Sequence, residues 1–77
     1  MEIKILGTGC PKCKQLEEAV KSVVKENAID ATIIKVEDIV DIMGYGIMRT
    51  PGLVVDGKVV MSGRLPAKSE IMELLTK

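Results

Sequence analysis

Seventy-seven residues suffice for one small domain with an efficiently filled core, and we expect residues 1–77 to form that single domain. Eleven basic and eleven acidic residues cancel, and the chain has one aromatic residue, so we expect neither the charged surface nor the stacking surface of a nucleic-acid-binding protein. No apolar run reaches membrane-spanning length, and no basic segment followed by a long apolar stretch begins the sequence. We therefore expect a cytoplasmic protein without membrane association.

The first half of the chain predicts a strand, a helix and a second strand. Residues 2–6 alternate polar and apolar side chains, as a strand does, and a helix follows from Pro11 because proline fits the first helical position. Glu17 and Lys21 are spaced for an i,i+4 ion pair, worth about 0.2–0.5 kcal/mol. The apolar positions of this helix are Cys13, Leu16, Val20, Val23 and Val24. Residues 31–36 form the next strand, which the helical connection makes parallel to the first.

The second half predicts a short helix, a hairpin and a final helix. Asp38 caps a helix that ends at Gly44, and the apolar face of this helix carries Ile39, Val40 and Met43. Strands at 53–55 and 58–61 flank Asp56-Gly57, the signature of a type I′ turn. The last helix has apolar positions at Ile71, Leu74 and Leu75, and the five methionines are expected to fill the core. The order βαβαββα predicts an α/β domain.

The segment Cys10-Pro11-Lys12-Cys13 contains both cysteines of the chain, at the predicted start of the first helix. A disulfide across so short a loop stabilises the folded protein by roughly 2 kcal/mol, against about 3 kcal/mol for a fifteen-residue loop. A purely structural cross-link is therefore a poor explanation for the pair. A thiolate at a helix start accepts backbone N–H groups and has a pKa between about 3.5 and 7.5, and the Lys12 cation acts in the same direction. Cys13 lies on the apolar stripe. We therefore expect Cys10 to attack a substrate disulfide and Cys13 to resolve the mixed disulfide.

Soft-metal binding or delivery is the alternative use of this pair. Heavy-metal chaperone domains are of similar length and carry a turn followed by Cys-x-x-Cys after their first strand, which Gly9 to Cys13 resembles locally. Their element order is βαββαβ, however, whereas this chain is predicted to end on a helix. A tetrahedral site within the chain would need two more cysteine or histidine ligands, and the sequence contains none. We therefore assign no metal ligand, and a metal would require a dimer or an external thiol.

A second segment, Tyr45 to Val55 with Thr50-Pro51, resembles the thioredoxin stretch that leads into the cis-proline strand. With the Cys-x-x-Cys pair, it makes nearly the whole chain similar to small, glutaredoxin-sized proteins of the thioredoxin-fold superfamily, the redox-active disulfide proteins. The resemblance implies a four-stranded mixed sheet flanked by three helices. It also implies a cis Pro51 against the disulfide, a Thr50 backbone that pairs with an extended substrate, and a Gly63 that leaves room for it.

Several positions depart from the pattern of the superfamily. Lys4 stands where thioredoxins carry a buried carboxylate, so the proton of the resolving thiol would pass to solvent or to a substrate group. Arg64 and Lys68 occupy positions that clamp glutathione in glutaredoxins, and Lys12 replaces their active-site tyrosine. We therefore expect protein disulfides as substrates and a thioredoxin-reductase-type protein, rather than glutathione, as electron donor. We expect a monomer with no cofactor beyond its redox-active disulfide.

Overall fold

The computed structural model describes residues 1–76, and residue 77 of the predicted domain lies outside this range. The elements in chain order are β1 (Glu2–Leu6), α1 (Pro11–Glu26), β2 (Thr32–Val36), α2 (Ile39–Gly44), β3 (Gly52–Val55), β4 (Lys58–Ser62) and α3 (Lys68–Thr76). The predicted α/β class and the order βαβαββα are confirmed, as is the four-stranded mixed sheet with three helices. Within residues 1–76, no helix is long and apolar enough to cross a membrane.

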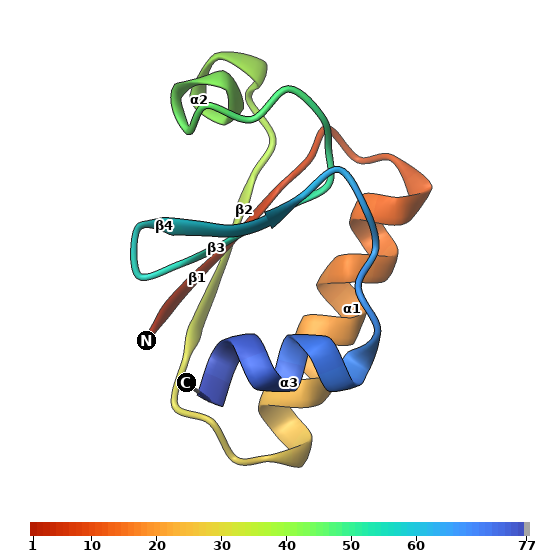
Figure 1. Ribbon diagram of the computed structural model, residues 1–77, viewed down its shortest axis with the longest axis vertical. Helices are drawn as coiled ribbons and strands as arrows, with labels where there is room; N and C mark the ends of the chain where they lie inside the picture. Colours follow the sequence, from red (N-terminus) through yellow and green to blue (C-terminus); the bar gives the residue numbers. More distant parts are fainter. Residues whose placement is uncertain (77) are drawn as a thin grey trace.

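The sheet has the strand order β2-β1-β3-β4, so β1 and β3 are central (Figure 1). β1 and β2 are parallel, as the helical crossover between them requires, and the other two neighbouring pairs are antiparallel. The β3–β4 turn has Asp56 and Gly57 at φ angles of 49° and 86°, the positive values that a type I′ turn needs. The predicted hairpin is therefore confirmed.

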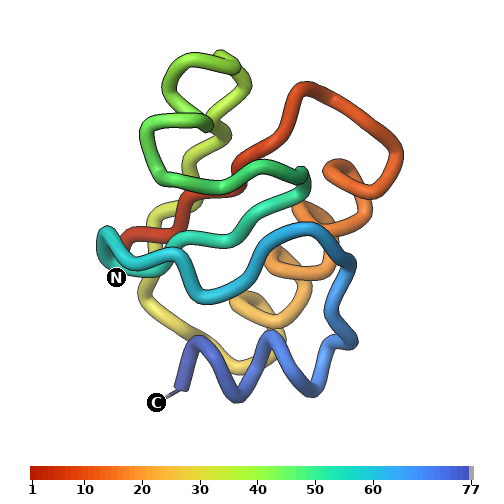
Figure 2. Tube along the Cα trace, turned by 45° about the horizontal axis from the view of Figure 1, so that its top comes forward, coloured from red at the N-terminus to blue at the C-terminus, as the bar shows by residue number. Residues whose placement is uncertain are grey.

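The two faces of the sheet are covered unequally. α1 and α3 pack together on one face, where they bury Ile3 and Ile5 of β1 with Leu16 of α1 and Ile71 of α3 (Figure 1). The alternate residue Leu6 belongs to a smaller cluster with Ile42, Ile47 and Val54. Figure 2 shows the chain leaving β2 in yellow, turning through α2 in green and returning to the sheet in teal. The cluster on the first face is the larger of the two, and it includes buried side chains of α1, the helix that begins at the cysteines.

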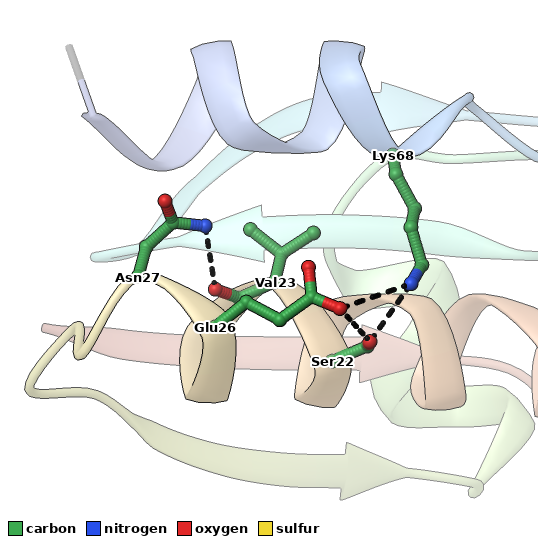
Figure 3. Close-up of polar contacts among 5 residues, drawn as sticks. All are labelled: Ser22, Val23, Glu26, Asn27 and Lys68. Carbon is green, nitrogen blue, oxygen red and sulfur yellow. Dashed lines mark hydrogen bonds and ion pairs between the residues drawn. The ribbon is translucent and has the colours of Figure 1, made fainter.

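Polar contacts join the C-terminal half of α1 to Lys68, the first residue of α3 (Figure 3). Lys68 Nζ donates to Ser22 Oγ at 2.8 Å and lies 3.5 Å from Glu26 Oε1. The Val23 carbonyl accepts both the Asn27 backbone amide, at 3.1 Å, and the Asn27 side-chain amide, at 2.9 Å, at the end of α1. These bonds fix where α1 stops and how α3 crosses it.

The apolar face predicted for α2 is wrong. Ile42 is 2% exposed and packs under the sheet, whereas Ile39, Val40 and Met43 are 55%, 72% and 66% exposed. α2 has six residues and buries only Ile42 among them. Ile42 packs with Leu6, Ile47 and Val54 because the chain turns back towards β3 after this helix. Most methionines are likewise not core fillers: only Met61 is buried, and Met48 is 98% exposed.

This difference predicts the stability of α2 variants. Ile42→Ala should lower the free energy of unfolding by about 2–5 kcal/mol, because it leaves a cavity in the smaller core. Val40→Ala, on the same helix, should change it by no more than about 0.5 kcal/mol, because its side chain is mostly in solvent. Chemical denaturation of both variants measures the two values. Equal losses would show that α2 buries the face predicted from the sequence.

Candidate active site at the start of α1

Cys10 is the N-cap residue of α1, and Pro11 occupies the first helical position as predicted. The backbone of Cys10 is extended, at φ −68° and ψ 161°, and its Sγ accepts a hydrogen bond from the Cys13 amide at 3.2 Å. Cys10 is half-buried and Lys12 is exposed, whereas Cys13 is 5% exposed on the inner face of the helix. The two cysteines form a disulfide with a Cα–Cα distance of 5.1 Å. One sulfur therefore faces the open helix end and the other faces the core.

Gly7, the residue after β1, makes the close packing of Cys13 possible. A Cβ atom at this position would overlap Cys13 Sγ and would lie 2.7 Å from Cys13 Cβ. The Gly7 amide donates to the Val36 carbonyl at 3.0 Å, so its backbone is also held by the end of β2. Nothing in the local sequence indicates this role, because the contact exists only once α1 folds back over β1.

The Thr50–Pro51 bond is cis, as the resemblance implied. Leu6 pairs with Gly52, so Pro51 lies at the same end of the sheet as Gly7, where β1 leads into the cysteine motif (Figures 1 and 2). Gly63 donates from its amide to the Pro51 carbonyl at 2.9 Å. The structure thus gathers the cysteines, Pro51 and Gly63 at one end of the sheet, although they are far apart in sequence.

A cleft of about 260 Å³ opens beside Thr50. Thr8 and Arg49 supply polar groups, and the remaining lining comes from Ile39, Ile42, Met43, Ile47 and Met48. Among residues 1–76, the backbone amide and carbonyl of Thr50 take no part in a hydrogen bond. The apolar part of this cleft is not evident from the sequence, whose pattern predicts the α2 side chains and the methionines in the core.

Lys4 lies on the face of the sheet that packs against α2. Its Nζ donates to the Tyr45 hydroxyl at 2.9 Å and lies 3.6 Å from Glu2 Oε1. The hydrogen bond to Tyr45 raises the pKa of Lys4 and keeps it cationic. The neighbouring residue Ile5 points to the α1 face instead, so Lys4 is turned away from Cys13. The position of the thioredoxin carboxylate is therefore filled by a residue that serves a different contact.

The two basic side chains expected near a glutathione site are paired within the chain. The Arg64 guanidinium binds both carboxylate oxygens of Glu70, in the first turn of α3. This pairing lowers the pKa of Glu70 and raises that of Arg64. Lys68 is bound to Ser22 and Glu26 of α1 (Figure 3). Their charges are therefore partly neutralised before any ligand arrives.

A half-buried cysteine caps the helix, a second cysteine is buried three residues later, and the Thr50–Pro51 loop lies at the same end of the sheet. Together these features define a thiol–disulfide oxidoreductase of the thioredoxin fold. The comparisons with known proteins agree. Residues 1–76 match the family described as the thioredoxin domain, and the chain belongs to this family. A thioredoxin of Methanocaldococcus jannaschii is 47% identical over 73 residues, covering 95% of this chain and 84% of that protein. A thioredoxin of Methanothermobacter thermautotrophicus is 41% identical over 76 residues, covering 99% of both chains.

The fold also bears on the metal-delivery alternative. The chain ends on α3 and places α2 between β2 and β3, which is not the βαββαβ order of the heavy-metal chaperones. Within residues 1–76, no three His, Cys, Asp or Glu side chains come together in a group that could hold a metal ion. The likeness between Gly9–Cys13 and the chaperone motif is thus confined to the motif itself.

The role of Gly7 can be tested by adding a single methyl group. Gly7→Ala should destabilise the protein by about 1–3 kcal/mol, the usual cost of overpacking, because Cys13 must move away from β1. The matched control is Gly44→Ala, where a Cβ meets nothing within 4 Å. This control should be neutral or slightly stabilising. Thermal unfolding of both variants gives the comparison, and similar melting temperatures would contradict the proposed packing.

Proposed function

We propose that this protein reduces disulfides of other proteins, with Cys10 as the attacking thiolate and Cys13 as the resolving thiol. The observation that carries the proposal is the unequal setting of the two sulfurs. Cys10 caps α1, where free amide groups and the helix dipole stabilise a negative charge, and Cys13 is buried on the same helix. A low-pKa, accessible thiol next to a shielded partner is the arrangement that disulfide exchange requires.

The chemistry proceeds in two exchanges. The Cys10 thiolate attacks one sulfur of the substrate disulfide, a Cys10–substrate bond forms, and the other substrate sulfur leaves with the electron pair and takes up a proton. Cys13 then loses its proton and attacks Cys10 Sγ, which releases the second substrate thiol and forms the Cys10–Cys13 disulfide. Two electrons have passed to the substrate. The disulfide is the only redox group that this cycle needs.

An extended protein segment suits the surface beside the disulfide. The unbonded amide and carbonyl of Thr50 offer a short edge for backbone pairing, and the apolar cleft next to it can take a side chain of the segment. Gly63, bonded to the Pro51 carbonyl, has no side chain to obstruct this edge. Pro51 would pack against the substrate sulfur. These features support Thr50, Pro51 and Gly63 as substrate-binding residues.

The electron donor in this proposal is a protein reductase of the thioredoxin-reductase type. Arg64 and Lys68 are engaged by Glu70 and by α1, which leaves them poorly placed to hold the carboxylates of glutathione. A reductase requires only access to Cys10 and to the Thr50 edge. We also propose that the protein acts as a cytoplasmic monomer and that Lys12 and Pro11 modulate Cys10 through charge and helix geometry.

Trapping tests the assignment of the two sulfurs. After reduction, limiting alkylation at neutral pH should label Cys10 well before Cys13, and peptide mapping reads the ratio. Cys13→Ser should accumulate a mixed disulfide with a substrate protein, whereas Cys10→Ser should not. Preferential labelling of Cys13, or accumulation only in Cys10→Ser, would reverse the roles. Failure of the wild-type protein to reduce insulin disulfides with dithiothreitol would overturn the function itself.

The donor proposal predicts a faster turnover of protein disulfides with a thioredoxin reductase and NADPH than with glutathione and its reductase. Glu70→Gln is the informative variant, because it releases Arg64 from its partner. This substitution should increase the glutathione-driven rate and leave the reductase-driven rate unchanged. If glutathione is the better donor for the unmodified protein, the protein works as a glutaredoxin despite its paired arginine.

A further inference from the structure

A second cavity opens beside Cys13, and it is separate from the substrate cleft. Its volume is about 100 Å³, which admits several water molecules. The residues that line it include Gly7, Cys13, Lys14, Glu17, Lys35 and Glu37, and none of them lines the cleft at Thr50. Cys13, although 5% exposed, therefore borders a space that charged side chains of α1, β2 and the residue after β2 help to line.

Glu17 is the anionic centre of this cavity. It lies four residues after Cys13, one helical turn further along the same face of α1. Its side chain is 14% exposed, and its carboxylate oxygens lie 3.1 Å from Lys21 Nζ and 3.5 Å from Lys35 Nζ. The hydrogen bond from Lys21, with the charge of Lys35, lowers the pKa of Glu17, so the carboxylate stays ionised at neutral pH.

Lys35 brings a cation to the same cavity from the edge strand β2. Its Nζ bridges Glu17 Oε1 at 3.5 Å and Glu37 Oε1 at 3.8 Å. Lys14, on α1, also lines the space. The charged side chains that line the cavity with Cys13 are thus two carboxylates, Glu17 and Glu37, and two cations, Lys14 and Lys35. Lys21, outside the lining, also pairs with Glu17. Removal of one of these charges therefore changes the electrostatic field at the Cys13 sulfur.

We propose that the Glu17–Lys35 ion pair is a positioning pair for the resolving step, which holds water beside Cys13 and gives its proton a route to solvent. This inference rests on the proposed disulfide exchange. The cavity shares no lining residue with the cleft at Thr50, where the substrate would lie. The Cys13 S–H proton passes to a cavity water, and the resulting thiolate attacks Cys10 Sγ. The Cys10–substrate bond breaks, and the substrate thiolate leaves with the electron pair and is protonated by solvent.

The test measures the ionisation of Cys13 alone. In a Cys10→Ser background, thiolate absorbance at 240 nm is followed against pH, with the Cys10→Ser/Cys13→Ser protein as the blank for tyrosine. Glu17→Gln should move the midpoint down by roughly 0.5–1 pH unit, because a negative charge near the thiolate is removed. Lys35→Met should move it up by a similar amount. Glu18→Gln, which removes the same charge from an exposed position outside the cavity, should leave the midpoint unchanged.

Opposite shifts from the two substitutions separate this role from loosened packing, which would move both midpoints in the same direction. In the otherwise unmodified protein, the pH profile for release of substrate from a preformed mixed disulfide should shift with the Cys13 midpoint, while the alkylation profile of Cys10 stays in place. Midpoints that coincide for Glu17→Gln, Lys35→Met and Glu18→Gln would overturn the inference. The titration does not depend on turnover, so a protein that fails to reduce disulfides would overturn the proposed function separately.

Discussion

The contact between Gly7 and Cys13 is the constraint on which the rest of the site depends. Because Gly7 has no side chain, α1 can begin directly over the end of β1, with the second sulfur pressed against the backbone. This packing decides that Cys13 is shielded and that Cys10 stands at the free end of the helix. It also fixes the position of the disulfide relative to Pro51, since Leu6 and Gly52 are paired in the sheet just before these two segments diverge. A single absent methyl group thus sets the difference between the two thiols.

The unequal covering of the sheet leaves open the surface that we propose for the substrate. α1 and α3 form a layer on one face of the sheet. The apolar core and the contacts of Lys68 hold α1, the helix that begins at the cysteines, in this layer. α2 has only six residues and buries one side chain fully, so it leaves Ile39, Val40 and Met43 in solvent. Ile39 and Met43 line the cleft at Thr50, and exposed apolar side chains of this kind favour binding of a partner protein. α2 therefore covers little of the sheet, and its side chains line one side of the cleft at Thr50.

The charges of the chain balance locally as well as in total. Lys4 is held by Tyr45 and Glu2, Arg64 by Glu70, and Lys35 by Glu17 and Glu37. These pairs are mostly exposed and contribute little to stability. Their importance lies in position: one pair contains Arg64, at a position that resembles the glutathione clamp of glutaredoxins, and another lines a cavity with Cys13. A protein with zero net charge can in this way place charged groups next to particular atoms, although its overall electrostatic field is weak.

The sequence alone determined the elements, because hydrophobic periodicity and turn residues are local signals. The alternation at residues 2–6, Pro11 at the helix start, the Asp56-Gly57 turn and the spacing of Ile71 and Leu75 all predicted structure that the fold confirms. The cysteine spacing, with Thr50-Pro51, indicated the chemistry and the superfamily. Tertiary structure alone decided the orientation of α2, the exposure of Met48, the need for glycine at position 7 and the meeting of Glu17, Lys35 and Cys13. Each of these depends on which segments pack together across the sheet, and such contacts between distant residues leave no periodic trace in the sequence.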